Sequence, residues 1–279
     1  MAICIKENQS ESYIYLCGIK PTRDVKLGDG ITLMAATANP TPDDMIDSIM
    51  KSTHPSEVEL GVLIATLRMT TAQIRIEGEI GRELAVKTWN VQQLCVQIST
   101  ILNCDLTWYF QADRPVEAFD SNTDVHIIME NMYRIPNGCF EIPEEKCAFL
   151  EQRIERACNL ADTNEKFHLA SNAMWSYRLN FMQAIRVSVI WSGIEALFMV
   201  DRNIKNTIAI VASRFICGND DKVEEIKALY KGARCKATHE YRNGTRELYE
   251  KSNELLHKLL LKCIEEGDTP NVNSILKSN

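Results

Sequence analysis

A short stretch late in the chain combines two side chains that can act together on a phosphodiester. Residues 230–241 read YKGARCKATHEY and place Arg234 five residues before His239. Histidine has an ordinary pKa of about 6.5, which suits proton transfer at neutral pH, and arginine stays charged and matches phosphate oxygens with its fork of N–H donors. RNA can be cut without a metal when its own 2′-OH attacks the adjacent phosphate, and this reaction needs a proton acceptor and a cation.

Three further residues can support such a site. Glu195 is the acid within the apolar segment WSGIEALF (191–198). An unpaired carboxylate there would be costly, so we expect Glu195 to pair with a cation of the motif. Lys231 and Lys236 flank the arginine, and both can contact phosphate.

The spacing of the pair also predicts an assembly. On an ideal helix five residues separate two side chains by about 140°, so Arg234 and His239 do not share one narrow face. A groove between two subunits would let two such pairs converge across a twofold axis. The partners we expect are therefore an RNA substrate and a second copy of the chain, bound through its helical half.

The elements that must position these residues differ between the two halves of the chain. Residues 1–142 mix strand patterns, among them 12–19 and a hairpin over 25–37, with helical ones such as 80–102. From Glu144 on, each segment has helical periodicity. We therefore predict an α+β chain, in which an N-terminal mixed α/β domain (1–142) precedes an all-helical bundle.

The bundle is expected to span residues 143–267, followed by a flexible tail over 268–279. Its most apolar stretch, 184–200, contains Arg186 and Glu195, which favours a buried core helix over a membrane span. We expect no membrane partner.

Charge separates the halves as well. Residues 1–150 hold 12 basic and 21 acidic residues, whereas residues 151–279 hold 19 basic and 17 acidic residues. The first half would repel a polyanion and the second could meet one. The acidic domain offers no catalytic group, and we expect a regulatory or partner-binding role for it.

Cysteine usage and the first residues bear on compartment and cofactors. The ten cysteines are scattered without a C-x-x-C pair, which argues against a zinc site, and we expect neither a metal nor a cofactor. The opening MAICIKENQSES has no long apolar run, so we expect a cytoplasmic protein with reduced thiols.

The R-x4-H spacing, the preceding Leu229-Tyr230 and the long helix with Glu195 together resemble the HEPN superfamily of helical domains, over roughly the last 135 residues. The family motif is R-x4–6-H. The resemblance implies a metal-independent ribonuclease that acts as a dimer in toxin or anti-phage defence systems. It implies that Arg234 and His239 are catalytic and that Glu195 helps to hold the site.

Two positions refine the resemblance. Cys235 follows the motif arginine where the family often has a polar residue, so one possible helper is missing. The string R-x4-H-x-Y is similar to the motif of HEPN toxins whose tyrosine is modified by a nucleotidyltransferase antitoxin, which implies such a role for Tyr241 and a protein regulator or antitoxin as partner. The sequence leaves two functions open: an RNA endonuclease, or a non-catalytic HEPN-like module for dimerisation and interaction.

Overall fold

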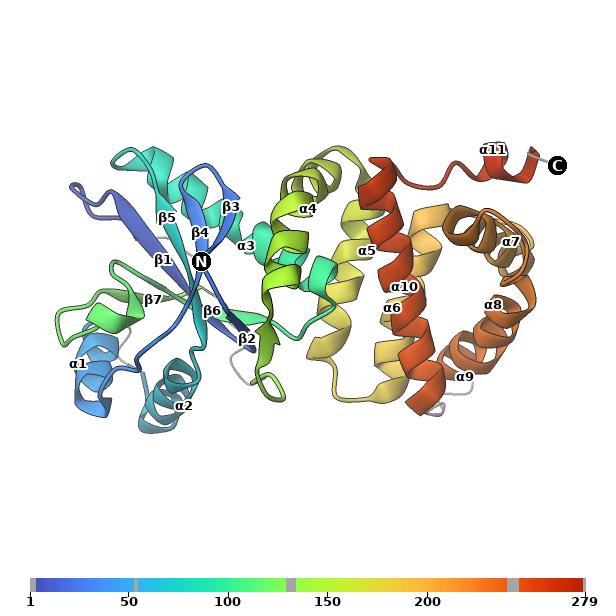
Figure 1. Ribbon diagram of the computed structural model, residues 1–279. Helices are drawn as coiled ribbons and strands as arrows, with labels where there is room; N and C mark the ends of the chain where they lie inside the picture. The colour runs from blue at the N-terminus through green and yellow to red at the C-terminus, as the bar shows by residue number, and fades with distance from the viewer. Residues whose placement is uncertain (1–3, 53–54, 129–133, 240–245, 278–279) are drawn as a thin grey trace. The chain divides into compact units, whose positions relative to one another are not determined.

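The computed structural model describes residues 4–52, 55–128, 134–239 and 246–277, except the side chains of Ser52, Thr238 and His239. The chain folds into two compact units (Figure 1). The first comprises Met1–Ile98 with Cys104–Glu155, and the second comprises Ser99–Asn103 with Arg156–Asn279.

The N-terminal unit is built on a six-stranded sheet in the order β3-β4-β5-β1-β6-β7, in which every neighbouring pair is antiparallel. The strands are β1 (Glu11–Cys17), β3 (Val25–Gly28), β4 (Ile31–Ala35), β5 (Ala72–Glu77), β6 (Thr107–Ala112) and β7 (Val125–Ile127). A separate parallel pair joins β2 (Ile19–Pro21) to β8 (Phe140–Ile142).

Helices α1 (Pro42–Ser52) and α2 (Glu57–Arg68) contribute to one core of this unit together with the short turn η1 (Val116–Ala118). Helix α3 (Arg82–Leu102) follows β5 in the chain. Ser56 and Glu59 form a capping box that starts α2 as a helix. The buried cluster joins side chains of both helices to the central strands: Tyr13, Tyr15, Met45, Ile49, Leu63, Leu67, Tyr109 and Phe110.

The rest of the chain is helical, and no strand occurs beyond residue 142 in the part that the structure describes. The elements are α4 (Glu144–Thr163), α5 (Glu165–Ser176), η2 (Tyr177–Leu179), α6 (Gln183–Phe198), α7 (Ile204–Cys217), α8 (Val223–Leu229), η3 (Tyr230–Cys235), α9 (Lys236–His239), α10 (Arg246–Glu266) and α11 (Val272–Lys277). The predicted α+β chain with a helical second half is thereby confirmed.

Helices α5, α6 and α10 form the centre of the C-terminal unit (Figure 1). Gly193 allows their close approach, because a Cβ atom at this position would lie 2.7 Å from the Cβ of Ala173 and 3.2 Å from Leu256. Trp191 is buried and donates from Nε1 to the Ser252 hydroxyl at 3.1 Å.

The expected buried core helix over 184–200 corresponds to α6, but only one side of that helix is buried. Ala184, Val187, Ile190 and Ile194 face the core, whereas Ile185, Ser192 and Met199 are exposed. The apolar composition of α6 therefore overstates its burial. No helix in the described ranges is long and apolar enough to cross a membrane.

The close packing at Gly193 generates a prediction for stability. Gly193→Ala should lower the free energy of unfolding by about 1–3 kcal/mol, because the new methyl group overpacks the α5–α6 contact. Gly61→Ala is the matched control: Gly61 lies in α2 with nothing within 4 Å of the added Cβ, and the change should stabilise by about 0.5–1 kcal/mol. Urea unfolding of both variants measures the two effects, and equal signs would contradict this account.

A second prediction concerns acid stability of the N-terminal unit. The Arg23 guanidinium donates two hydrogen bonds to the Glu151 carboxylate at 2.7 and 2.8 Å, and this contact lowers the pKa of Glu151 to about 2. A carboxylate whose pKa is depressed in the folded state stabilises the fold at pH values above its pKa in the unfolded state. This contribution disappears as the pH falls from about 4 towards 2. Glu151→Gln should therefore destabilise at pH 7, by at most about 1 kcal/mol for this partly exposed pair, and not at pH 2. Urea unfolding at both pH values measures this loss, and Glu155→Gln on the same helix should show no such difference.

Candidate functional site

The site begins with a carboxylate on an otherwise apolar helix. Glu195 lies in the last turn of α6, and its side chain retains 28% of its accessible surface. Its Oε1 atom accepts a hydrogen bond from Nε of Arg234 at 2.9 Å and another from the hydroxyl of Tyr230 at 3.3 Å. Glu195 therefore pairs with a cation of the motif, as its apolar surroundings in the sequence predict.

The two donors come from one unusual turn. Residues Tyr230–Cys235 are wound as a π-helix, a form that is rare and is frequently found at functional sites. Tyr230 and Arg234 are four residues apart and therefore face the same way, with the guanidinium carbon 5.5 Å from the centre of the tyrosine ring. Tyr230 in turn meets Trp191 edge to face, with ring centroids 5.1 Å apart.

Burial and charge act on both donors. Burial and the Glu195 carboxylate raise the pKa of the Tyr230 hydroxyl, which therefore stays protonated and donates at neutral pH. For Arg234, burial by itself would lower the pKa, but the hydrogen bond to Glu195 and its charge outweigh burial and raise the pKa. The guanidinium of Arg234 thus stays charged at neutral pH.

The chain continues from the π turn directly into α9, which contacts α6. Lys231 and Lys236 are exposed on either side of Arg234, whose own side chain retains 21% of its accessible surface. Cys235 is partly buried. Arg234 is therefore partly exposed, and a lysine on each side of it in the sequence is exposed.

The remaining predicted residues are placed only in part. His239 is the last residue of α9, its side chain lies outside the described part of the structure, and so does the whole of Tyr241. Of the predicted site residues, the structure thus brings together Glu195 and Arg234. Tyr230 is a site residue that sequence reasoning missed. Its i, i+4 spacing to Arg234 was the available signal.

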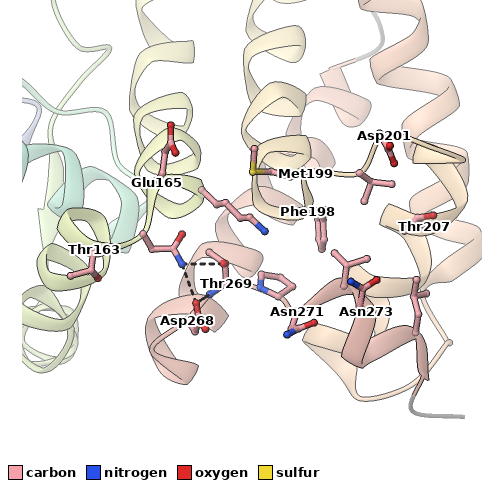
Figure 2. A pocket seen from close by; sticks show the side chains of 16 residues that line it. Thr163, Glu165, Phe198, Met199, Asp201, Thr207, Asp268, Thr269, Asn271 and Asn273 are labelled. Carbon is pink, nitrogen blue, oxygen red and sulfur yellow. Dashed lines mark hydrogen bonds between the residues drawn. The ribbon is translucent and has the colours of Figure 1, made fainter.

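A pocket lies elsewhere in the same unit. An open pocket of about 860 Å³ is lined by residues from α4, the loop before α5, the end of α6, α7 and the segment before α11 (Figure 2). Asn164 caps α5 and donates from Nδ2 to Asp268 and Thr269 across one side of it. Glu165, Asp201 and Asp268 outnumber its single lysine, so the lining does not suit a polyanion such as RNA.

The described residues of the Arg234 site can hold and orient a phosphate but offer no set of metal ligands. No group of three or more His, Cys, Asp or Glu side chains suited to a metal occurs among the residues that the structure describes. No protein-family model matches the chain, and no curated protein or solved structure matches it either.

The ion pair yields a prediction that separates it from ordinary surface pairs. Glu195→Ala and Arg234→Ala should each lower the free energy of unfolding by about 1–3 kcal/mol, because each leaves a partly buried charged group without its partner. The double variant should be less damaging than the sum, with a coupling of at least about 0.5 kcal/mol.

The matched control is Arg246 with Glu250, an exposed i, i+4 pair on α10 with an N–O distance of 2.7 Å. Its coupling should be clearly smaller than that of the Glu195 pair, because solvent screens an exposed contact. Urea unfolding of both cycles is the measurement, and equal couplings would mean that the Glu195 pair is an ordinary surface contact.

Proposed function

We propose that the C-terminal unit is a metal-independent RNA endonuclease in which Arg234 and His239 are the catalytic residues. The observation that carries the proposal is the contact between Glu195 and Arg234. It fixes a partly exposed guanidinium two residues before the short helix that ends at His239. A held cation and a histidine, whose ordinary pKa suits proton transfer at neutral pH, are the minimum that RNA cleavage by its own 2′-OH requires.

The reaction can be written with its atoms in balance. The 2′ oxygen attacks the adjacent phosphorus. His239 takes the proton of the 2′-OH while water protonates the leaving 5′ oxygen, or water takes the 2′-OH proton while His239 protonates the leaving 5′ oxygen. The bond from phosphorus to the 5′ oxygen breaks, which leaves a 2′,3′-cyclic phosphate and a 5′-hydroxyl. Arg234 stabilises the charge on the phosphorane-like transition state, and Glu195 and Tyr230 position Arg234.

The proposal extends to context. A ribonuclease of this kind fits a cytoplasmic toxin or an anti-phage defence protein, regulated by a protein partner or antitoxin. The acidic N-terminal unit fits the regulatory part, because its surplus of 21 acidic over 12 basic residues in 1–150 disfavours contact with RNA.

One observation favours the second candidate function, a non-catalytic module for dimerisation and interaction. Arg234 is ion-paired to Glu195 and stacked near Tyr230, as a purely structural arginine would be. The two functions differ in whether loss of the imidazole of His239 changes the RNA.

The catalytic prediction is direct. Purified full-length protein should cleave single-stranded RNA in EDTA, spare DNA of the same sequence and leave 2′,3′-cyclic phosphate ends. His239→Ala and Arg234→Ala should each lower the cleavage rate by about 10²–10⁴. Lys236→Ala should instead weaken RNA binding and reduce the salt slope of the binding constant by about 1.

His168→Ala on α5 is the matched histidine control and should keep the wild-type rate. Rates from gel-resolved oligonucleotides, with circular dichroism to verify folding, measure these effects. Cutting that stops with chelator, or full activity in His239→Ala, would reject the mechanism and favour the non-catalytic module.

A further inference from the structure

A groove lies where α7, α8 and α10 meet in the C-terminal unit (Figure 1). Its volume is about 110 Å³. Three of its lining side chains are apolar and more than nine-tenths buried: Ile226, Leu229 and Leu255. We call this hollow the α8 groove and those three residues its floor. It shares no lining residue with the pocket of Figure 2, so it is a separate candidate for binding.

The α8 groove also carries an excess of positive charge. Three half-exposed lysines line it: Lys222, Lys251 and Lys258. Its lining has two carboxylates, Glu225 and Glu254, which contact Lys222 and Lys258 at 2.8 and 2.7 Å. Lys251 contacts Glu247 at 2.8 Å, and Glu247 lies outside the lining. The lining therefore has one more positive charge than negative charge.

Glu225 shows what these lysines attract. Its carboxylate accepts a hydrogen bond from Lys222, and the charges of Lys251 and Lys258 act on it as well. The hydrogen bond and the three charges lower the pKa of Glu225 against the opposing effect of burial. The pairs among these residues are exposed contacts of the kind that contributes little to stability. A carboxylate of a partner can therefore exchange with Glu225 at small cost.

The size of the groove fits one large apolar side chain. A volume of about 110 Å³ holds about four waters at liquid density, and a leucine side chain takes up a comparable space. A leucine that enters would contact the apolar floor and release the water that covers it. The groove thus combines a seat for one apolar side chain with ammonium groups around it.

We propose that the α8 groove binds an acidic segment of another protein, in which one leucine-like side chain meets the floor and neighbouring carboxylates meet the three lysines. Charge complementarity selects this partner, because an apolar segment would leave the lysines unused. An RNA strand would leave the apolar floor without a partner. The α8 groove is a surface other than the Arg234 site, so the inference does not depend on RNA cleavage.

A synthetic peptide tests the chemistry of the partner. The probe is a fluorescein-labelled peptide of about ten residues, with one central leucine among glutamate, aspartate and serine residues. Fluorescence anisotropy with the full-length chain should show saturable binding with a Kd below about 1 mM. Replacing the leucine by serine should weaken binding at least about tenfold, because the apolar contact is lost. Replacing the acidic residues by their amides should weaken it at least as much.

Variants of the chain test the place of binding. Lys251→Glu and Lys258→Glu should each weaken binding of the leucine peptide at least about tenfold, because each reverses a charge of the groove. Glu225→Gln should tighten binding about twofold or more, since it removes the acid that competes with the peptide. A misfolded protein would not show this gain, and circular dichroism verifies the fold of each variant.

Lys205→Glu is the matched control. Lys205 is exposed on α7, about 12 Å along the helix from Ser213 of the groove lining. At physiological salt this distance exceeds the screening length of about 8 Å, so the variant should bind the peptide as the wild-type chain does. Equal losses in Lys205→Glu and Lys251→Glu would mean that only net charge matters, and would overturn the proposal.

Other occupants of the groove would give different results. Absence of saturable binding up to about 1 mM would overturn the proposal. Equal affinity of the leucine and serine peptides, together with displacement of either by single-stranded RNA, would identify a phosphate-binding surface and would also overturn it. Sedimentation velocity in which the wild-type chain self-associates and Lys251→Glu does not would assign the groove to a second copy instead. The peptide proposal stands if the leucine, the acids and the three groove variants act as stated.

Discussion

A carboxylate on an apolar helix has to be compensated, and the form of that compensation organises the C-terminal unit. Glu195 has apolar neighbours along α6, and Tyr230 and Arg234, which both donate to it, come from one π turn. The contact holds that turn, and the short α9 that follows it, against α6. Whatever the motif does, its arginine is positioned by this pair and not by solvent.

The two sides of helix α6 differ in packing: one is buried in the unit and the other is exposed. On the inner side Gly193 permits an approach to Ala173 that no larger residue would allow, so α5, α6 and α10 pack closely. On the outer side the same helix keeps apolar and small residues where charge would be usual. Among the described residues, the other elements of this unit cover one side of α6 and leave Ile185 and Ser192 exposed.

The Arg234 pair and the pocket of Figure 2 lie in the same unit but differ in the charge of the residues around them. The polar pocket near α11 belongs to a different chemistry, because its acidic lining would repel the polyanion that Arg234, Lys231 and Lys236 would attract.

The hydrophobic period and the turn residues of short segments determine many of the strands and helices of this fold without tertiary contacts. The hairpin over 25–37 occurs as β3 and β4, and the helix expected over 80–102 occurs as α3. Period and turn residues are properties of neighbours in sequence, so they can be read without the fold. The capping box of Ser56 with Glu59 likewise starts α2 through residues that are close in sequence.

What tertiary structure decided depends on partners far along the chain. The pair β2 and β8 has three residues per strand, too few for a period to show, and it forms because residues 19–21 and 140–142 meet in the fold. The need of Glu195 for a cation followed from its apolar neighbours, but the participation of Tyr230 required the π turn. The sequence determined that α6 is apolar; only the packing of α5 and α10 decided which side stays bare, because burial depends on what other helices cover and not on composition.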